Sequence, residues 1–375
     1  MASCVVAGAG GFIGGHLVSA LVADGHKVRA VDSKATEDWC QRSRDVDSLE
    51  VDLRDLSACR KALAGCDGAT VFNLAADMGG IGFIEGNKAA CMLSVLINTH
   101  LLLAARDEGV GRYFYASSAC VYAAGKQDRP DIAALAEPDA YPAMPEDGYG
   151  WEKLFSERMC RHFAEDYGMA TRVARYHNIY GPQGAYDGGR EKAPAAICRK
   201  VASAVLAGDD TIEIWGDGEQ TRSFTYIDDC VTGTQLIAAS DVTEPLNLGS
   251  SEMVTINQLV DLVEQVAGVR LKRRHLLDAP QGVRGRSSDN TLIQERLGWE
   301  PTTSLADGIE ATYRWIHDEL AAGRTPSRVV AGRDSLRKGE TPGSGESPGN
   351  GEHGHDNGSA SVGQANQQAG VAGTR

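Results

Sequence analysis

The chain has 375 residues with a formal net charge of −14 at pH 7, and 42% of its residues are hydrophobic. This length and composition are sufficient for one large or two modest domains with a substantial core. The negative charge argues against a nucleic-acid-binding surface, although local arginines can still hold a small ligand that carries phosphate.

Nine cysteines are scattered along the sequence without the spacing of a metal site or a disulfide framework. This pattern is typical of a reducing compartment. We find no apolar run that approaches the roughly 18 residues needed to cross a bilayer, and residues 1–3 lead directly into a strand-like segment. We therefore expect a cytoplasmic protein without a metal and without a membrane partner.

A glycine-rich turn follows the first predicted strand, residues 4–8, and leads into an amphipathic helix that reaches about residue 24. Gly8, Gly11 and Gly14 allow a tight turn, a close approach to a pyrophosphate and packing of the helix on the strand. The helix N-terminus offers unpaired N–H groups to the anion. The spacing is G-x-x-G-x-x-G rather than G-x-G-x-x-G, but its place between strand and helix predicts dinucleotide binding.

Acidic residues follow the next two predicted strands. Asp32 ends the strand of residues 27–31, where a carboxylate can accept both ribose hydroxyls and favours NAD over NADP. No arginine immediately follows it, although Arg42 and Arg44 lie farther on and leave NADP open. Asp52, in a strand predicted at 49–53, is either an adenine contact or a charged strand terminus.

Two further strands are predicted to bring polar residues to the ligand-binding edge of a parallel sheet. The apolar segment 69–76 is typical of a buried parallel strand, and a glycine-containing loop at 77–82 follows it. After a helix from about residue 87 to 108, a strand at 113–116 delivers Ser117 to Cys120 to the same edge, where such sheets bind ligands.

Tyr149 and Lys153 are four positions apart and share one face of a predicted helix. A nearby ammonium lowers the pKa of a phenol, so we expect Tyr149 to be a usable base near neutral pH. A bare Tyr-x-x-x-Lys pair is common on solvated helices, and its meaning depends on the surrounding motifs. The Ala-, Pro- and Asp-rich segment 123–145 before it is predicted to be a loop over the site.

The strand–helix alternation weakens after a strand at 170–176. Glu191 and Lys192 precede a helix at 195–207, where charges usually serve as solvated capping residues. A strand is predicted at 211–215, and residues 216–229 are read as a dense turn followed by an apolar strand. Arg222, Arg284 and Arg286 are candidate anion-binding guanidinium groups.

Helices are predicted at 252–266 and 305–320, and the composition then changes. From residue 322 Gly, Ser, Pro, Asn and Gln dominate, and such a segment cannot bury enough surface to fold. We predict a disordered tail at 322–375, in which His353 and His355 are too isolated to indicate a metal site.

These elements predict an α/β protein with a Rossmann-type doubly wound parallel sheet and a smaller C-terminal α/β substrate-binding domain. The NAD-binding domain is placed at residues 1–176 and completed by about 208–250, and the substrate-binding domain at 177–207 and 251–321.

Motifs along residues 3–320 resemble those of the extended short-chain dehydrogenases/reductases that act on nucleotide sugars. The motifs are the glycine turn, Asn73-Leu-Ala-Ala, the Ser118/Tyr149/Lys153 set, and Gly216-Asp-Gly with Arg222-Ser-Phe. Within that family, longer segments are similar to the GDP-mannose 3,5-epimerases, namely residues 77–84, 115–120, 177–182, 188–196, 215–224 and 282–290.

The resemblance implies a mechanism. Tyr149 and Lys153, with Ser118, would oxidise the sugar at C4 with NAD, and the resulting ketone acidifies C3–H and C5–H because each carbanion is an enolate. Cys120 and Lys192 resemble the acid/base pair that inverts C5, C3 or both, giving GDP-L-gulose or GDP-L-galactose. Reduction at C4 then regenerates NAD.

The resemblance also implies a homodimer through paired helices and two sets of binding residues. The cofactor set is Gly8, Gly11, Phe12, Ile13, Gly14, Asp32, Asp52, Tyr149 and Lys153. The substrate set is Gly79, Ser117, Ser118, Cys120, Asn178, Glu191, Lys192, Ala193, Lys200, Gln220, Thr221, Arg222 and Arg286. Trp151 departs from the family pattern, and so does the loop 123–146, which leaves the product open.

Three other functions remain alternatives. A nucleotide-sugar 4,6-dehydratase usually carries acidic residues where this chain has Ala119 and Cys120, and a C4-epimerase does not need Lys192. A non-catalytic NAD-sensing protein would have no need of the intact hydride-transfer residues, although fold alone never proves chemistry.

Overall fold

The computed structural model describes residues 3–39, 41–43 and 46–324. Arg44 and the predicted tail from residue 325 onward, including His353 and His355, lie outside the described residues. The centre of the fold is a seven-stranded sheet in the order β11-β6-β5-β4-β1-β2-β3, with every neighbouring pair parallel. Its strands are β1 (Ser3–Ala7), β2 (Lys27–Asp32), β3 (Asp47–Glu50), β4 (Thr70–Asn73), β5 (Arg112–Ser118), β6 (Thr171–Tyr176) and β11 (Leu246–Leu248).

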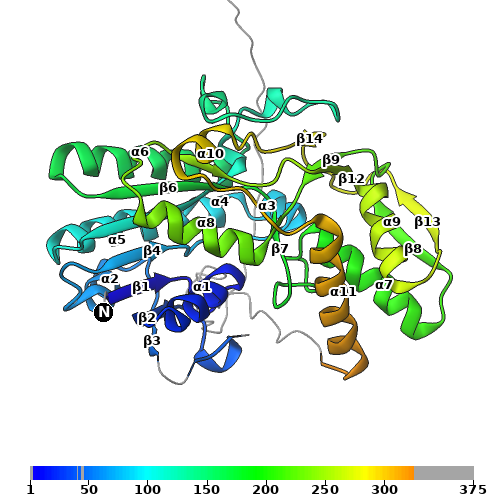
Figure 1. Ribbon diagram of the computed structural model, residues 1–375, viewed down its shortest axis with the longest axis horizontal. Coiled ribbons are helices and arrows are strands. Elements are labelled where there is room, and N and C mark those ends of the chain that lie inside the picture. The colour runs from blue at the N-terminus through cyan, green and yellow to red at the C-terminus, as the bar shows by residue number, and fades with distance from the viewer. Residues whose placement is uncertain (1–2, 40, 44–45, 325–375) are drawn as a thin grey trace, which may run out of the picture. The chain divides into compact units, whose positions relative to one another are not determined.

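Helices cover both faces of this sheet (Figure 1). Alternate residues of one strand point to opposite faces, so Val6 of β1 packs with α1 and α8, whereas Val5 packs with α2, α5 and α6. The helices are α1 (Phe12–Ala23), α2 (Leu56–Leu63), α5 (Ser94–Asp107), α6 (Tyr149–Tyr167) and α8 (Ile227–Ala239). The predicted doubly wound fold class is therefore confirmed.

The order of the strands creates a switch point beside β1. The chain runs from β1 to β2 and β3 on one side, and β4 to β6 and β11 then extend the sheet on the other side. In open parallel sheets, ligands bind outside the carboxyl ends of the strands at such a point. The glycine turn after β1 and the polar ends of β4 and β5 lie at this edge.

A second group of elements has its own hydrophobic core. Its main helices are α7 (Ala193–Ala207), α9 (Ile256–Ala267) and α11 (Leu305–Ala321). Its strands are β8 (Thr211–Trp215) paired with β13 (Lys272–Leu276), and β9 (Thr221–Ser223) between β12 (Met253–Thr255) and β14 (Gly285–Arg286). A short parallel pair is formed by β7 (Ile179–Tyr180) and β10 (Thr225–Tyr226). The remaining α-helices of the described chain are the short α3 (Ile81–Gly86), α4 (Lys88–Met92) and α10 (Thr291–Leu297).

Several expected elements differ in the structure. The apolar segment at the end of the 216–229 turn is the helix α8 and not a strand, because Ile227, Cys230, Val231 and Thr234 recur with helical spacing and are buried. The helix expected at 87–108 is divided into α4 and α5 at Leu93. Asp52 follows β3 in a turn instead of lying in the strand. The predicted domain boundaries stay a prediction, and β8 pairs with β13 outside the large sheet.

Among the described residues, Lys88–Asp107 is long and apolar enough to cross a membrane by length and composition alone. By this measure the expectation that no run approaches such a length does not hold. In the fold, Leu101, Leu102, Ala104 and Ala105 of α5 are buried in the core between the sheet and its helices.

Candidate active site

The glycine turn after β1 has the close backbone approaches that its sequence predicts. Gly8 has a φ of 86°, and a Cβ atom on Gly14 would lie 2.1 Å from the Gly8 carbonyl oxygen. Gly11 is the N-cap of α1 and provides no side-chain cap, and the first turn carries no acidic residue. The N-terminal N–H groups of α1 are thus suited to a phosphate anion. Phe12 and Ile13 begin this helix.

Asp32 is held beside the glycine turn at the end of β2. Its carboxylate accepts hydrogen bonds of 2.9 Å from the Gly10 amide and 2.9 Å from the Lys34 amide. The Lys34 ammonium donates to the Gly10 carbonyl at 3.1 Å, and the Trp39 indole donates to the Lys34 carbonyl at 3.1 Å. This placement fits the predicted ribose contact. Lys34 and Trp39, which hold the same turn, were not among the residues predicted from the sequence.

Asp52 lies in the turn after β3 and is paired with Arg54. The Arg54 guanidinium donates to both carboxylate oxygens, at 3.0 Å from Nε and 2.6 Å from Nη2. These hydrogen bonds hold the pKa of Asp52 below its usual value. Its predicted contact with adenine stays a prediction.

Ser118, Cys120 and Tyr149 meet where β5 ends and α6 begins. Ser118 is the last residue of β5, and its hydroxyl accepts a 3.2 Å hydrogen bond from the Cys120 amide. Cys120 lies in the following turn and shares a buried cluster with Tyr149, the first residue of α6. A Cβ atom on Gly150 would lie 2.4 Å from the Cys120 carbonyl oxygen, so this glycine allows the start of α6 to approach the turn.

Burial determines the protonation of Tyr149. Burial raises the pKa of Tyr149 well above its ordinary value, negative charge at Cys120 and Glu152 adds to the shift, and a hydrogen bond with Ser118 opposes it. The sequence predicted a lowered pKa because of Lys153. The Lys153 ammonium lies 5.5 Å from the centre of the Tyr149 ring and donates to the Ala116 carbonyl at 3.0 Å. The expected direction is therefore wrong for the protein alone, because the loss of hydration outweighs the attraction.

Glu152 is a buried carboxylate beside this set that the sequence analysis missed. One of its oxygens accepts hydrogen bonds of 3.0 Å from the Tyr115 hydroxyl and 3.0 Å from the Ser156 hydroxyl. The other oxygen is 3.8 Å from the Lys153 ammonium. The acidic side chain thus provides a counter-charge to Lys153 in the first turn of α6.

Ser117 is directed to a different group of residues. Its hydroxyl donates to Glu157 at 2.5 Å, and Glu157 forms a buried two-pronged ion pair with Arg175 at 2.9 and 2.7 Å. Successive residues of a strand face opposite sides of the sheet, which separates the Ser117 hydroxyl from that of Ser118. The predicted role of Ser117 in binding the sugar stays a prediction, and its hydroxyl is used inside the fold.

Two loops that are distant in sequence pack together near these residues. The Gly80 amide donates to the Arg190 carbonyl at 3.0 Å, and a Cβ atom on Gly80 would lie 2.2 Å from the Glu191 carbonyl oxygen. A Cβ atom on Gly79 would lie 3.2 Å from the Arg190 Cα atom. The structure therefore brings the predicted sugar-pocket residues Gly79 and Glu191 together.

Lys192 follows these loop residues as the N-cap of α7, with Ala193 as the first residue of the helix. Burial lowers the pKa of Lys192, and negative charge at Cys120 opposes this shift. Lys192 directly follows Arg190 and Glu191, whose backbones contact Gly79 and Gly80, and its role in the site stays a prediction.

Two arginines reach the same region from paired strands. Arg222 of β9 and Arg286 of β14 are register partners. Burial lowers the pKa of Arg222 to about 10, opposed by negative charge at Cys120. The Arg286 guanidinium lies 3.6 Å from the Cys120 sulfur. The long-range pairing of the two strands therefore brings Arg286 to the cysteine, whereas the Arg222 guanidinium donates to the backbone carbonyls of Thr221, Gln281 and Val283.

The remaining residues of the predicted substrate set are held mainly by backbone carbonyls. The Lys200 ammonium donates to the Glu213 backbone carbonyl at 2.8 Å and lies 5.8 Å from the centre of the Trp215 ring. The side-chain amides of Asn178 and Gln220 donate to the carbonyls of Ser223 and Trp215 at 2.9 and 3.2 Å. The Thr221 hydroxyl donates to the Pro130 carbonyl at 2.5 Å.

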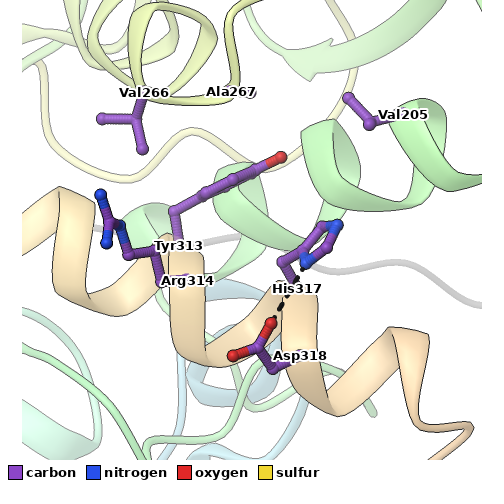
Figure 2. Close-up of a pocket in the computed structure, with 7 residues that line it drawn as sticks. All are labelled: Val205, Val266, Ala267, Tyr313, Arg314, His317 and Asp318. Atoms are coloured by element: carbon purple, nitrogen blue, oxygen red, sulfur yellow. Dashed lines mark hydrogen bonds and ion pairs between the residues drawn. The ribbon is translucent and has the colours of Figure 1, made fainter.

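Two cavities on the described surface lie apart from these residues. The first has a volume of about 410 Å³ and is lined by residues of α7, α9 and α11, where His317 contacts Asp318 at 3.3 Å (Figure 2). The second, of about 600 Å³, is lined by hydroxyl-rich segments of residues 250–252, 288–291 and 300–304. Neither includes a residue of the predicted sites. Within the described part of the chain, no group of three or more His, Cys, Asp or Glu side chains could hold a metal ion.

The chain is similar in sequence to one protein family and to named members of it. Residues 4–249 match the model of the NAD dependent epimerase/dehydratase family. The chain is 47% identical over 333 residues to GDP-mannose 3,5-epimerase 1 of Oryza sativa subsp. japonica, which covers 88% of this chain and 86% of the relative. It is 46% identical over 316 residues to GDP-mannose 3,5-epimerase of Arabidopsis thaliana, with coverage of 84% and 82%.

A solved structure of UDP-glucose 4-epimerase from Thermotoga maritima, determined with UDP-glucose, has the same fold. It superposes with a TM-score of 0.76 at 26% identity and covers 85% of this chain and 99% of that protein.

Proposed function

The chain belongs to the NAD dependent epimerase/dehydratase family, and we propose that it epimerises GDP-mannose at C5, C3 or both through a transient 4-keto sugar. Its cofactor is NAD. One observation carries the proposal: the Cys120 thiol shares a buried cluster with Tyr149 at the end of β5 and the start of α6. We infer that Tyr149, as the redox residue, and the acid/base pair of Cys120 and Lys192 act at one site. The names of the plant relatives support GDP-mannose as the substrate.

The residues present fit NAD. The uncapped start of α1 and the glycine turn provide a cradle for the pyrophosphate, and Asp32 lies beside that turn to accept the ribose hydroxyls. When bound, NAD would supply reversible hydride chemistry at C4 of the sugar. Lys153 would hold the cofactor beside Tyr149.

The protein's own residues carry the proton transfers. Tyr149 takes the proton of the C4 hydroxyl, and Ser118 stabilises the phenolate by the hydrogen bond that opposes the burial effect. Oxidation at C4 acidifies the neighbouring C–H bonds. Inversion then requires one group to remove a proton and another to return one from the opposite face, which is the role proposed for Cys120 and Lys192.

The arrangement of Lys192 suits this role. Burial lowers its pKa from the usual value, so Lys192 releases a proton more readily than an exposed lysine. Arg222, which is also desolvated, is proposed to bind the diphosphate because a guanidinium matches phosphate geometry.

Incubation with GDP-mannose in deuterium oxide tests the proposal. We expect deuterium at C5, and at C3 as well if both centres invert, with GDP-L-gulose or GDP-L-galactose as the product. Cys120→Ala should abolish the exchange and retain NAD, and Tyr149→Phe should abolish the transient NADH absorbance. Absence of exchange at both carbons would exclude the epimerase.

The same experiment separates the rival reactions. A C4-epimerase would invert C4 without deuterium at C3 or C5, whereas a 4,6-dehydratase would lose water and shift the product mass. A panel of other nucleotide sugars tests the substrate. Binding of NAD with no reaction on any of them would support the sensor alternative.

We also propose a homodimer formed through helices of the α4–α6 region. Large apolar side chains are exposed there, namely Met92, Leu93, Leu96, Trp151 and Phe155, of which Phe155 is 54% exposed. Such a patch is a feature of an interface. Light scattering should give the mass of a dimer, and Phe155→Glu should give a monomer. A monomeric wild-type chain would contradict this.

A cytoplasmic location is the remaining part of the proposal. The cysteines among the described residues are free, which suits a reducing compartment. Fractionation of cells with an antibody to the chain tests this, and recovery in another fraction would exclude it.

A further inference from the structure

The Arg286 guanidinium is surrounded by three different groups. Its Nε atom donates to the Gln127 side-chain oxygen at 2.7 Å, and Nη1 lies 3.6 Å from the Cys120 sulfur. Its Nη2 atom forms an ion pair with the carboxylate of Glu146. Only 7% of the Arg286 side chain is exposed. One cation thus joins the proposed acid/base cysteine to two residues of the segment 123–148.

Glu146 is connected to Cys120 by two routes. Its backbone amide donates to the Cys120 carbonyl at 3.0 Å, and its carboxylate holds the guanidinium that contacts the sulfur. The Glu146 side chain is 19% exposed, so solvent screens this ion pair less than a surface pair. The position and the net charge of the group beside the sulfur therefore depend on Glu146.

We propose that Glu146 is a positioning residue that holds the Arg286 guanidinium against Cys120 and, by neutralising part of its charge, controls how readily the thiol gives up its proton. The expected effect of Glu146 on catalysis rests on the proposed function, whereas its expected effect on the acidity of the Cys120 thiol does not.

Other ionisable groups that face Cys120 come from the neighbouring elements. They are Lys192 at the start of α7, Arg222 of β9, Tyr149 of α6 and Cys91 of α4. Arg286 differs from the other cations because its guanidinium lies within contact distance of the sulfur. Glu146 is the carboxylate with which that guanidinium is paired.

Two substitutions of Glu146 have opposite consequences under this proposal. Glu146→Gln keeps an oxygen that can accept from Nη2 but removes the negative charge, so Arg286 stabilises the thiolate more strongly. Glu146→Ala removes the anchor of Nη2 and leaves only Gln127 at Nε, so the guanidinium can swing away from the sulfur and the thiolate loses its partner. A residue that only supports the fold would shift both variants in the same direction or neither.

Alkylation of Cys120 by iodoacetamide as a function of pH tests this in the full chain without a nucleotide sugar. The thiolate is the reactive form, and peptide mass spectrometry identifies the modified residue, with Cys120→Ser as the blank. The pH midpoint should fall by about one unit in Glu146→Gln and rise by about one unit in Glu146→Ala, as expected for gain or loss of an effective neighbouring charge. Glu310→Gln, on the exposed face of α11, should leave the midpoint unchanged.

Arg286→Lys provides a second test if Glu146→Ala fails to fold. Lysine lacks the planar fork that reaches three partners, so the alkylation midpoint should rise in this variant and fall in Glu146→Gln. Midpoints that stay within error of the wild type, or that move together, would overturn the inference.

Deuterium exchange on GDP-mannose is measured separately from the alkylation of the Cys120 thiol. The acidic limb of the pH profile for deuterium exchange should move with the alkylation midpoint. Shifted alkylation without any exchange on GDP-mannose would reject the proposed function and keep the role of Glu146. Exchange with unshifted alkylation would reject the role of Glu146 and keep the function.

Discussion

The Arg190 guanidinium donates a 2.9 Å hydrogen bond to Asp77 and joins two loops that are 113 residues apart in the chain. The same side chain donates to the Met78 carbonyl at 2.8 Å and lies 3.7 Å from the centre of the Phe83 ring. One loop carries Gly79 and the other carries Lys192. The position of the proposed acid/base lysine relative to the sugar pocket therefore depends on Arg190.

Arg190→Ala should weaken substrate binding because both loops lose this connection. We expect KM for the nucleotide sugar to rise about tenfold, or about 1.4 kcal/mol, which is within the range for hydrogen bonds made by a charged group. The affinity for NAD should not change. Steady-state kinetics and NAD titration measure the two effects, with Arg314→Ala on α11 as the control. An unchanged KM would show that the loops are held by other contacts.

Gly14→Ala should disrupt the cofactor site. The added Cβ atom would lie 2.1 Å from the Gly8 carbonyl oxygen, so the backbone of the glycine turn must move. We expect the Kd for NAD to rise at least about 100-fold, or about 2.7 kcal/mol. Isothermal titration measures Kd, and circular dichroism monitors folding. Gly86→Ala is a matched control because no atom lies within 4 Å of its Cβ position; similar affinities in both variants would contradict the proposed cradle.

Glu152→Gln should move the redox step to lower pH. The negative charge of Glu152 contributes to the raised pKa of Tyr149, so its removal lowers that pKa. Formation of NADH requires the phenolate, and its rate increases as pH rises through the pKa of Tyr149. At any pH below the pKa of Tyr149 the variant has the larger phenolate fraction, so we expect its rate of NADH formation to be about three to ten times that of the wild type, as for a pKa lowered by about half to one unit. Stopped-flow absorbance measures the rate, and Glu165→Gln at the exposed end of the same helix is the control. An unchanged rate would mean that Glu152 has no electrostatic influence on Tyr149.

His177 should make the fold sensitive to acid. Burial lowers the pKa of His177 from 6.5 to about 4. Below pH 6.5 the unfolded chain therefore binds a proton that the native chain does not, and stability is lost as pH falls toward 4. From pH 7.5 to pH 5 this group alone should cost about 2 kcal/mol in the free energy of unfolding.

Urea unfolding at the two pH values tests this expectation. His177→Gln removes the titrating group, and its loss of stability between pH 7.5 and pH 5 should be smaller than that of the wild type by the same amount. His162→Gln, on the exposed surface of α6, should behave as the wild type does. Equal pH dependence in His177→Gln and the wild type would contradict the prediction.

The local features of this protein could be predicted from its sequence. The turn from β1 to α1 depends on glycines within a few positions of one another, and Tyr149 and Lys153 are related by a single helical turn. Long apolar strands also predict a buried parallel sheet. The segment of α8 was harder to predict, because its residues are apolar enough for a strand, although Ile227, Cys230, Val231 and Thr234 recur with helical spacing and pack on β6 and α1.

The tertiary structure decided which of these residues meet and in what charge state. Burial reversed the expected shift of the Tyr149 pKa, since hydration is lost through packing by residues distant in the chain. The contact of Arg286 with Cys120 depends on the pairing of β14 with β9, and the ion pair of Arg286 with Glu146 depends on the path of the loop before α6. Sequence patterns extend over a few residues, whereas these contacts result from long-range packing. The sequence alone therefore identified the glycine turn and the Tyr149–Lys153 pair, and only the fold showed that Glu146, Arg286 and Cys120 form one group.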